Sequence, residues 1–166
     1  MQNGPQTTFD QNCTIAGLLT SRAEALDSLP FASFEGTAWS YAETLANSRA
    51  FASSLVAAGG KPADRVAMMM ENSLEFLSAW FGTALASGVH VPLNPEYRGQ
   101  ILSQVLADIA SRYMVIDAHL LPNLLAAIDG VDHQIELIVV VGAPSGGELP
   151  EGEGWRAVSW DSFHDA

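Results

Sequence analysis

Between residues 64 and 95, blocks of hydrophobic and polar positions predict a strand, a helix and a second strand. An apolar run at 66–70 is followed by a polar break, an alanine-rich apolar segment at 74–86 and a second apolar run at 89–93. Ser73 is the expected helix N-cap, because its hydroxyl can accept a hydrogen bond from an amide of the first turn. Two apolar runs joined by a helix-length segment are typical of a βαβ unit in a parallel sheet. Because the helical segment is apolar on most faces, we expect it in the interior.

The same kind of pattern predicts two helices and a hairpin ahead of this unit. Residues 14–26 carry apolar side chains at helical spacing. Two short strands, at 31–34 and 37–39, flank a Glu-Gly pair that suits a hairpin turn. Ser40 and Glu43 form an S-x-x-E capping box. This box predicts a second helix that begins at the next residue and ends at a glycine pair.

Beyond the central unit, helices and strands continue to alternate. Helical spacing is found at 99–109 and 119–128, and apolar strand patterns are found at 113–116 and 137–141. Alternation of this kind predicts an α/β fold, with a mostly parallel sheet and flanking helices.

The last part of the chain changes in composition. Residues 143–154 are rich in glycine, proline and glutamate and predict a loop, and 155–159 predict a short edge strand. Residues 161–166 resemble the first turn of a helix that is too short to bury a face. We therefore expect the chain to end at a cut and not at a natural terminus.

These patterns divide the chain into three parts. We expect a flexible polar arm at 1–13, an α/β unit at 14–142, and a loop with the beginning of a further segment at 143–166.

Composition restricts the class of protein. The 166 residues, of which 48% are hydrophobic, suit one packed domain. A net charge of −12 with seven basic residues disfavours binding to nucleic acid or to anionic membranes. The longest apolar segment is too short and too mixed to span a bilayer, and no signal-peptide pattern is present in the sequence. With Cys13 as the single cysteine, we expect a reducing cytoplasm.

Few residues point to chemistry on their own. The sequence contains no P-loop, no G-x-G-x-x-G motif, no G-x-S-x-G motif and no histidine pair at i, i+4. His90 lies inside a predicted strand, where a hydrogen-bonded structural role is favoured over a catalytic base. Arg98 precedes a predicted helix, so its guanidinium could hold an anion there, although spacing alone favours a surface salt bridge. The residues alone thus indicate an α/β domain without a self-contained active site.

Five segments occur in an order that is typical of one superfamily. They are WSYAE at 39–43, GGKPADRV at 59–66, MENSLEF at 70–76, GVHVPLNP at 88–95 and DIASRYMVID at 108–117. These segments resemble the N-terminal features of adenylate-forming (AMP-binding) enzymes, which include acyl-CoA synthetases, peptide-synthetase adenylation domains and luciferases. Ala63 stands where glycine is usual in the second segment. The run NPEYRG at 94–99 resembles the acid–CoA ligase branch, including crotonobetaine/carnitine–CoA ligase-like members.

The resemblance implies a two-step ligase of fatty acid or carnitine metabolism. ATP and a carboxylic acid would give an acyl-adenylate and pyrophosphate, with Mg²⁺ assisting. A thiol, usually CoA, would then displace AMP and form the thioester. The acid itself is not implied, because the family's acyl pocket is built mainly from residues beyond this chain.

Most of the family's machinery has no counterpart in this sequence. The Ser/Thr/Gly-rich phosphate loop, the hinge aspartate and the catalytic lysine are missing, and Lys61, the single lysine, lies in a turn of the wrong segment. The resemblance therefore implies an N-terminal fragment that is inactive alone, binds no ATP, CoA or Mg²⁺ alone, and has the C-terminal remainder of the enzyme as its partner. Apolar faces exposed by the cut also predict a homodimer.

One turn of the chain is the candidate ligand site. In CoA-forming members this turn lies near the CoA nucleotide, which implies that Asn94, Pro95, Glu96 and Arg98 face CoA. Glu96 replaces an arginine of some ligases, and its carboxylate would repel the CoA phosphates unless Arg98 compensates. No catalytic residue and no metal ligand is assigned.

Three alternatives remain open. The chain could belong to an adenylation domain that loads a carrier protein. It could be a stand-alone, non-catalytic binding or regulatory module with affinity for nucleotide or CoA. It could also be a different α/β enzyme whose site the motifs do not reveal.

Overall fold

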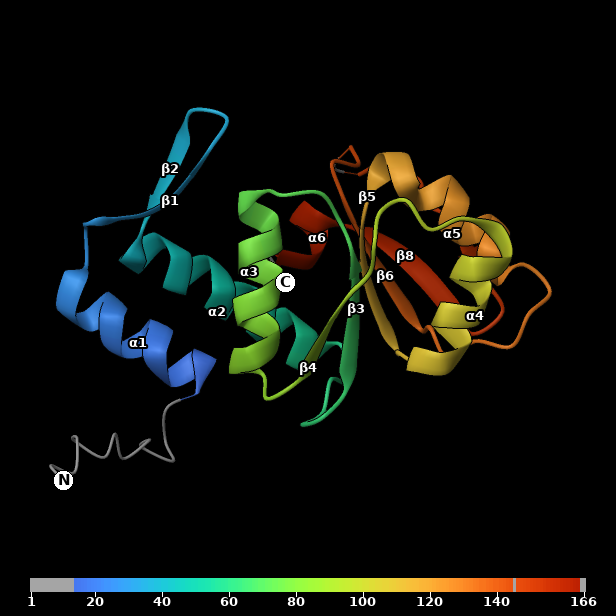
Figure 1. The fold of residues 1–166 in the computed structure, drawn as a ribbon, viewed down its shortest axis with the longest axis horizontal. Helices are drawn as coiled ribbons and strands as arrows, with labels where there is room; N and C mark the ends of the chain where they lie inside the picture. The colour runs from blue at the N-terminus through green and yellow to red at the C-terminus, as the bar shows by residue number, and fades with distance from the viewer. Residues whose placement is uncertain (1–13, 145, 165–166) are drawn as a thin grey trace, which may run out of the picture.

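A computed structural model describes residues 14–144 and 146–164, which form a mostly parallel sheet with helices on both faces (Figure 1). This confirms the predicted α/β class. The predicted arm at 1–13 lies outside the described residues. In chain order the elements are α1 (Ile15–Leu26), β1 (Pro30–Phe34), β2 (Thr37–Ser40), α2 (Tyr41–Ala57), β3 (Arg65–Met69), α3 (Leu74–Leu85), β4 (Val89–Pro92), α4 (Gly99–Ile109), β5 (Tyr113–Asp117), the 3-10 helix η1 (Ala118–Leu120), α5 (Leu121–Ile128), β6 (Leu137–Val141), β7 (Glu151–Gly152), β8 (Trp155–Ser159) and α6 (Trp160–His164).

The predicted helix starts follow from local capping. In α2 the amide of Ser40 donates to Glu43 Oε2 at 2.7 Å, and the amide of Glu43 donates to Ser40 Oγ at 3.2 Å. This reciprocal pair is the capping box that the sequence predicts. In α3 the amide of Phe76 donates to Ser73 Oγ at 3.0 Å, which confirms the expected N-cap.

The main sheet has the strand order β4-β3-β5-β6-β8-β7, and β1 and β2 form a separate hairpin. All pairs in the main sheet are parallel except β7 with β8. The prediction that 155–159 is an edge strand was wrong, because β8 lies between β6 and β7. The predicted loop at 143–154 also contains β7, whose two residues are too few to give a sequence pattern.

The central strand β3 is buried on both faces, which explains its unbroken apolar run. Val66 and Met68 face the side covered by α2, α3 and α6, whereas Ala67 and Met69 face the side covered by α4 and α5. All four side chains are fully buried. The methionine run is therefore core, as the pattern predicts.

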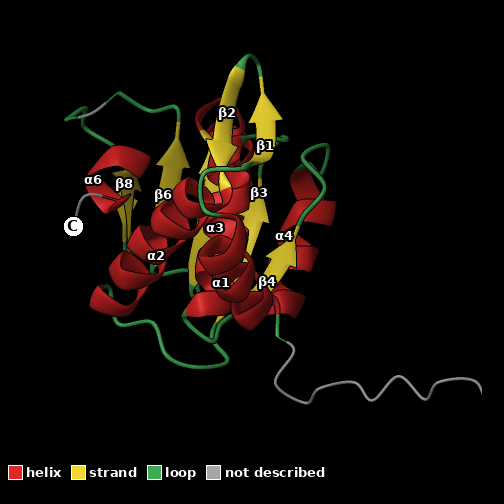
Figure 2. Ribbon diagram, turned by 90° about the vertical axis from the view of Figure 1, so that its left-hand side faces the viewer, coloured by secondary structure: helices red, strands yellow, loops and turns green. Residues whose placement is uncertain are grey.

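Helix α3 is interior on one face only, so the prediction of a wholly interior helix was too broad. Its fully buried positions carry small side chains, namely Ser78, Ala79, Gly82 and Thr83. Its larger side chains Trp80 and Phe81 are half-buried. The buried residues of α3 are small because α2 crosses α3 closely. The opposite face of α3 packs against α1 and not against the sheet. Figure 2 shows α1 in front of α3, with the strands of the main sheet behind them.

The short α6 contradicts the expectation that the final segment cannot bury a face. Phe163 is 6% exposed, and its ring lies 5.3 Å from that of Phe51. Trp160 stacks on Phe51 at 5.6 Å. Aromatic contacts to α2 stabilise α6, so this five-residue helix does not depend on its own backbone hydrogen bonds alone.

His90 lies on β4 beside two aromatic rings of α3. Its ring centroid is 5.7 Å from both Phe76 and Trp80. The buried Nε2 atom has no hydrogen-bond partner among the described residues, so the predicted hydrogen-bonded role was wrong for this atom. Burial lowers the pKa of His90, which favours the neutral imidazole at physiological pH.

A cluster of charged side chains joins three strands at their amino ends. Arg112, just before β5, donates from Nη1 to Asp64 Oδ2 at 2.9 Å, and from Nε and Nη2 to Glu136 at 2.8 and 2.7 Å. Asp64 precedes β3 and Glu136 precedes β6. The hydrogen bonds from Arg112 lower the pKa of the Glu136 carboxyl. These ion pairs join the amino ends of β3, β5 and β6.

Within the described residues, the structure has no helix that is long and apolar enough to cross a membrane.

Candidate functional site

The carboxyl ends of β4, β3 and β5 are adjacent at one edge of the sheet. The chain leaves β3 through α3 on one face and leaves β5 through η1 and α5 on the other face. A change of face between neighbouring parallel strands marks the position where α/β sheets bind ligands. This edge is therefore the candidate site, and the predicted turn at 94–98 lies on it.

The turn after β4 is held by its own backbone and by one side chain. The amide of Leu93 donates to Met68 O at 2.8 Å and extends the pairing with β3. Asn94 Oδ1 accepts a hydrogen bond of 2.9 Å from the amide of Glu96, and the amide of Tyr97 donates to Asn94 O at 3.0 Å. This Asx-type turn directs the chain from β4 to α4 and fixes Pro95 at its tip. The carboxylate of Glu96 remains on an exposed residue.

Arg98 ends the turn and is the N-cap residue of α4. Its Nη1 donates to the carbonyl oxygens of Pro95 and Tyr97. No ion pair of Arg98 is found among the described residues, so the salt bridge favoured by spacing is not observed. The side chain gives no hydrogen bond to the cap of α4. The amides of the first turn of α4 and the positive guanidinium therefore lie at the same corner, an arrangement that favours an anion.

A second contact at this edge joins the loop after β3 to the last residue of β5, and sequence patterns did not predict it. Asp117 Oδ2 accepts a hydrogen bond of 2.7 Å from the amide of Glu71. Burial raises the pKa of the Asp117 carboxyl, and the hydrogen bond from Glu71 partly opposes this effect. His119 Nε2 lies 3.8 Å from Glu71 Oε1, and both side chains are mostly exposed. The sequence signals at this position were an aspartate at the end of an apolar strand pattern and its place as the last residue of the segment at 108–117.

The residues predicted as the candidate site lie close together at this edge, whereas Asp117 lies farther away. The structure brings Asn94, Pro95, Glu96 and Arg98 together in one turn, and it places Asp117 two strands away, at the end of β5. Residues 14–144 and 146–164 contain no group of three His, Cys, Asp or Glu side chains that could hold a metal ion.

Comparison with known proteins agrees with this scaffold. The sequence profile of the AMP-binding enzyme family matches residues 19–164. Tyrocidine synthase 2 of Brevibacillus parabrevis is 29% identical over 130 residues, which are 78% of this chain and 4% of the synthase. The 4-hydroxybutyrate–CoA ligase 2 of Metallosphaera sedula is 27% identical over 120 residues, which are 72% of this chain and 22% of the ligase.

Solved structures share the fold. The anthranilate CoA ligase in complex with anthranoyl-AMP superposes with a TM-score of 0.80 at 17% identity, covering 95% of this chain and 29% of that one. The benzoate CoA ligase from Burkholderia xenovorans gives a TM-score of 0.74 at 18% identity, covering 92% and 28%. The chain thus spans under a third of each of these ligases. It is α/β with the family's N-terminal topology, and its sequence matches the family profile over nearly its whole length. The chain therefore belongs to the AMP-binding enzyme family.

Proposed function

We propose that this chain is the N-terminal part of an AMP-forming acid–thiol ligase, in which residues 14–142 are scaffold and residues 143–166 lead into the catalytic segments. The single observation that carries the proposal is the family match over residues 19–164. The parent would convert a carboxylic acid and ATP into an acyl-adenylate and pyrophosphate, and then into a thioester and AMP. The C-terminal remainder of the same enzyme is the partner that completes the site, and the compartment is the cytoplasm.

We propose CoA as the thiol acceptor, in the manner of acid–CoA ligases such as the crotonobetaine/carnitine group. Support comes from the turn of Asn94, Pro95, Glu96 and Arg98, where the α4 amides and one guanidinium form a corner suited to a phosphate. Glu96 opposes this fit, because its exposed carboxylate lies two residues from Arg98. The chain's residues would bind and orient the nucleotide end of CoA. We assign them no step of bond formation and no Mg²⁺ ligand.

A second candidate acceptor is a carrier protein. It is favoured by the similarity to peptide synthetases, including surfactin synthase subunit 1 of Bacillus subtilis at 28% identity over 102 residues. Both candidates share the adenylation step and differ only in the thiol that follows.

Substitution of the turn distinguishes the two acceptors. In the full-length parent, Arg98→Gln is expected to raise the KM for CoA about tenfold, because a charge-assisted contact to phosphate is lost. Glu96→Gln is expected to lower that KM, because a repulsive charge is removed. Acid-dependent pyrophosphate release should not change in either variant, and initial rates with varied CoA provide the measurement.

Arg49→Gln is the matched control, because Arg49 is an exposed arginine of α2 away from this edge. An unchanged KM for CoA in both turn variants would contradict the assignment of the turn to CoA. If the wild-type parent released no pyrophosphate with any acid, the proposed ligase activity would be contradicted instead.

A further inference from the structure

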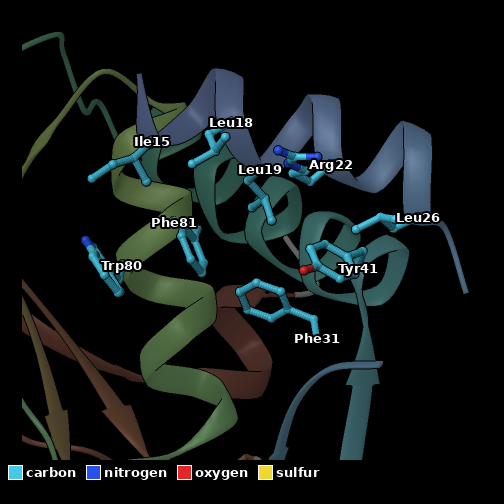
Figure 3. Close-up of a pocket in the computed structure, with 9 residues that line it drawn as sticks. All are labelled: Ile15, Leu18, Leu19, Arg22, Leu26, Phe31, Tyr41, Trp80 and Phe81. Carbon is cyan, nitrogen blue, oxygen red and sulfur yellow. The ribbon is translucent and has the colours of Figure 1, made fainter. Parts of the chain in front are cut away.

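A groove between α1, β1 and α3 lies on the far side of α3 from the sheet, away from the β4 turn (Figures 1 and 3). Its volume is about 580 Å³, which is within the usual range of small-molecule sites. The apolar lining comes from three elements: Ile15, Leu18 and Leu19 of α1, Phe31 of β1, and Trp80 and Phe81 of α3. We call this feature the α1–α3 groove.

The floor of the α1–α3 groove is held rigid by aromatic contacts. Trp80 stacks on Phe81 at 5.0 Å, and Phe31 meets Phe81 edge-on at 5.8 Å. The lip is more open, because Ile15 and Leu18 are 47% and 49% exposed. Aromatic side chains that are already packed in this way do not need to rearrange to accept an apolar ligand. Little binding free energy is therefore spent on ordering side chains.

Two polar groups face the apolar space. Arg22 of α1, an exposed residue, and Tyr41 both line the groove, and Figure 3 shows Arg22 against α1 and the Tyr41 hydroxyl beside the ring of Phe31. Among the residues that the structure describes, Arg22 is the one charged residue that lines the groove. Within the described residues it forms no ion pair, although the chain carries a net charge of −12. A cation without a partner beside apolar rings suits an anion with an apolar body.

We propose that the α1–α3 groove binds an amphiphilic carboxylate, with the hydrocarbon part on the rings of Phe31, Trp80 and Phe81 and the carboxylate on Arg22. A guanidinium can hold a carboxylate through two parallel hydrogen bonds, and the Tyr41 hydroxyl can donate a third. A neutral ligand would leave Arg22 unused, and a cationic ligand would be repelled by it. The site is separate from the β4 turn and goes beyond the proposed ligase function, on which it does not depend.

Calorimetric titration of the 166-residue chain with decanoate below its micelle concentration tests this site. Decanoate is expected to bind at one site, and Arg22→Gln should weaken binding about tenfold or more, because a charge-assisted pair is lost. Decan-1-ol is a probe of the same length without charge, and its binding should be equal in wild type and in the variant. Arg49→Gln is the control for loss of one positive charge elsewhere, and it should bind decanoate as wild type does.

A second variant separates the groove from non-specific adsorption. Leu18→Glu places a negative charge on the exposed lip without touching the buried core, and it should abolish decanoate binding while circular dichroism stays unchanged. Equal decanoate affinity in wild type and Arg22→Gln would overturn the proposal. It would also be overturned if sedimentation showed a dimer that Leu18→Glu dissociates, because a second copy would then occupy the groove.

Discussion

Replacing Phe51 with alanine is expected to lower the free energy of unfolding by about 3–5 kcal/mol. Phe51 is fully buried on α2, and its ring contacts Trp160 and Phe163 of α6 as well as the sheet core. Truncation leaves a cavity where α2, α6 and the sheet meet, and it removes the rings against which the short α6 packs. Urea unfolding followed by far-UV circular dichroism measures the loss.

Two further variants show whether the loss comes from the cavity. Phe51→Leu keeps most of the volume and should cost clearly less than the alanine variant. Val56→Ala removes an apolar side chain that is 56% exposed on the same helix, and it should leave the stability nearly unchanged. If Phe51→Ala and Val56→Ala have equal stability, Phe51 does not hold α6 in place.

The substitution of Gly82 with alanine should also destabilise the chain, by about 1–3 kcal/mol. A Cβ atom at this position would lie 2.7 Å from the backbone oxygen of Ser48 and 2.7 Å from the Cδ1 atom of Phe51. The first of these atoms belongs to the backbone of α2, so α2 and α3 must separate. Thermal or urea unfolding of the variant gives the measurement.

The sign of this effect distinguishes packing from helix propensity. Propensity alone predicts that alanine at position 82 stabilises α3 by about 1 kcal/mol. Ala84→Gly on the same helix is the control, because Ala84 is half-buried and the change should cost about 1 kcal/mol by propensity. A stabilised Gly82→Ala variant would contradict the close crossing of α2 and α3.

Local patterns predicted the elements because their causes are local. The capping box of Ser40 and Glu43 and the cap at Ser73 are contacts between residues three positions apart. A short stretch of sequence therefore contains both partners of each contact. The apolar run of β3 is predictable for a similar reason, since burial on both faces removes the alternation of polar residues.

Contacts between distant segments were not predictable in this way. The hydrogen bond from Glu71 to Asp117 and the pairing of Arg112 with Asp64 and Glu136 depend on strand order, which no single segment specifies. The position of β8 inside the sheet depends on the two-residue β7, which carries no pattern.

The assignment of the turn at 94–98 as a ligand site stays a prediction, and the structure shows where this turn lies. The resemblance implies a ligand site in the turn at 94–98, and the structure places that turn at the carboxyl edge of the sheet. The use of the Arg98 guanidinium on carbonyl oxygens of its own turn could not be predicted, because spacing does not show which acceptors a long side chain meets. The α1–α3 groove is formed by side chains from four separate elements, α1, β1, α2 and α3, and has no sequence signature.

The most direct test of the central claim is the nucleotide product formed by the full-length parent enzyme. Purified parent is incubated with ATP, Mg²⁺ and a panel of aliphatic and aromatic carboxylic acids, and the nucleotides are separated by chromatography. The account predicts acid-dependent release of pyrophosphate, and, once the thiol acceptor is added, formation of AMP and thioester in equal amounts. Formation of ADP and phosphate, or AMP formation that does not depend on any acid, would contradict it.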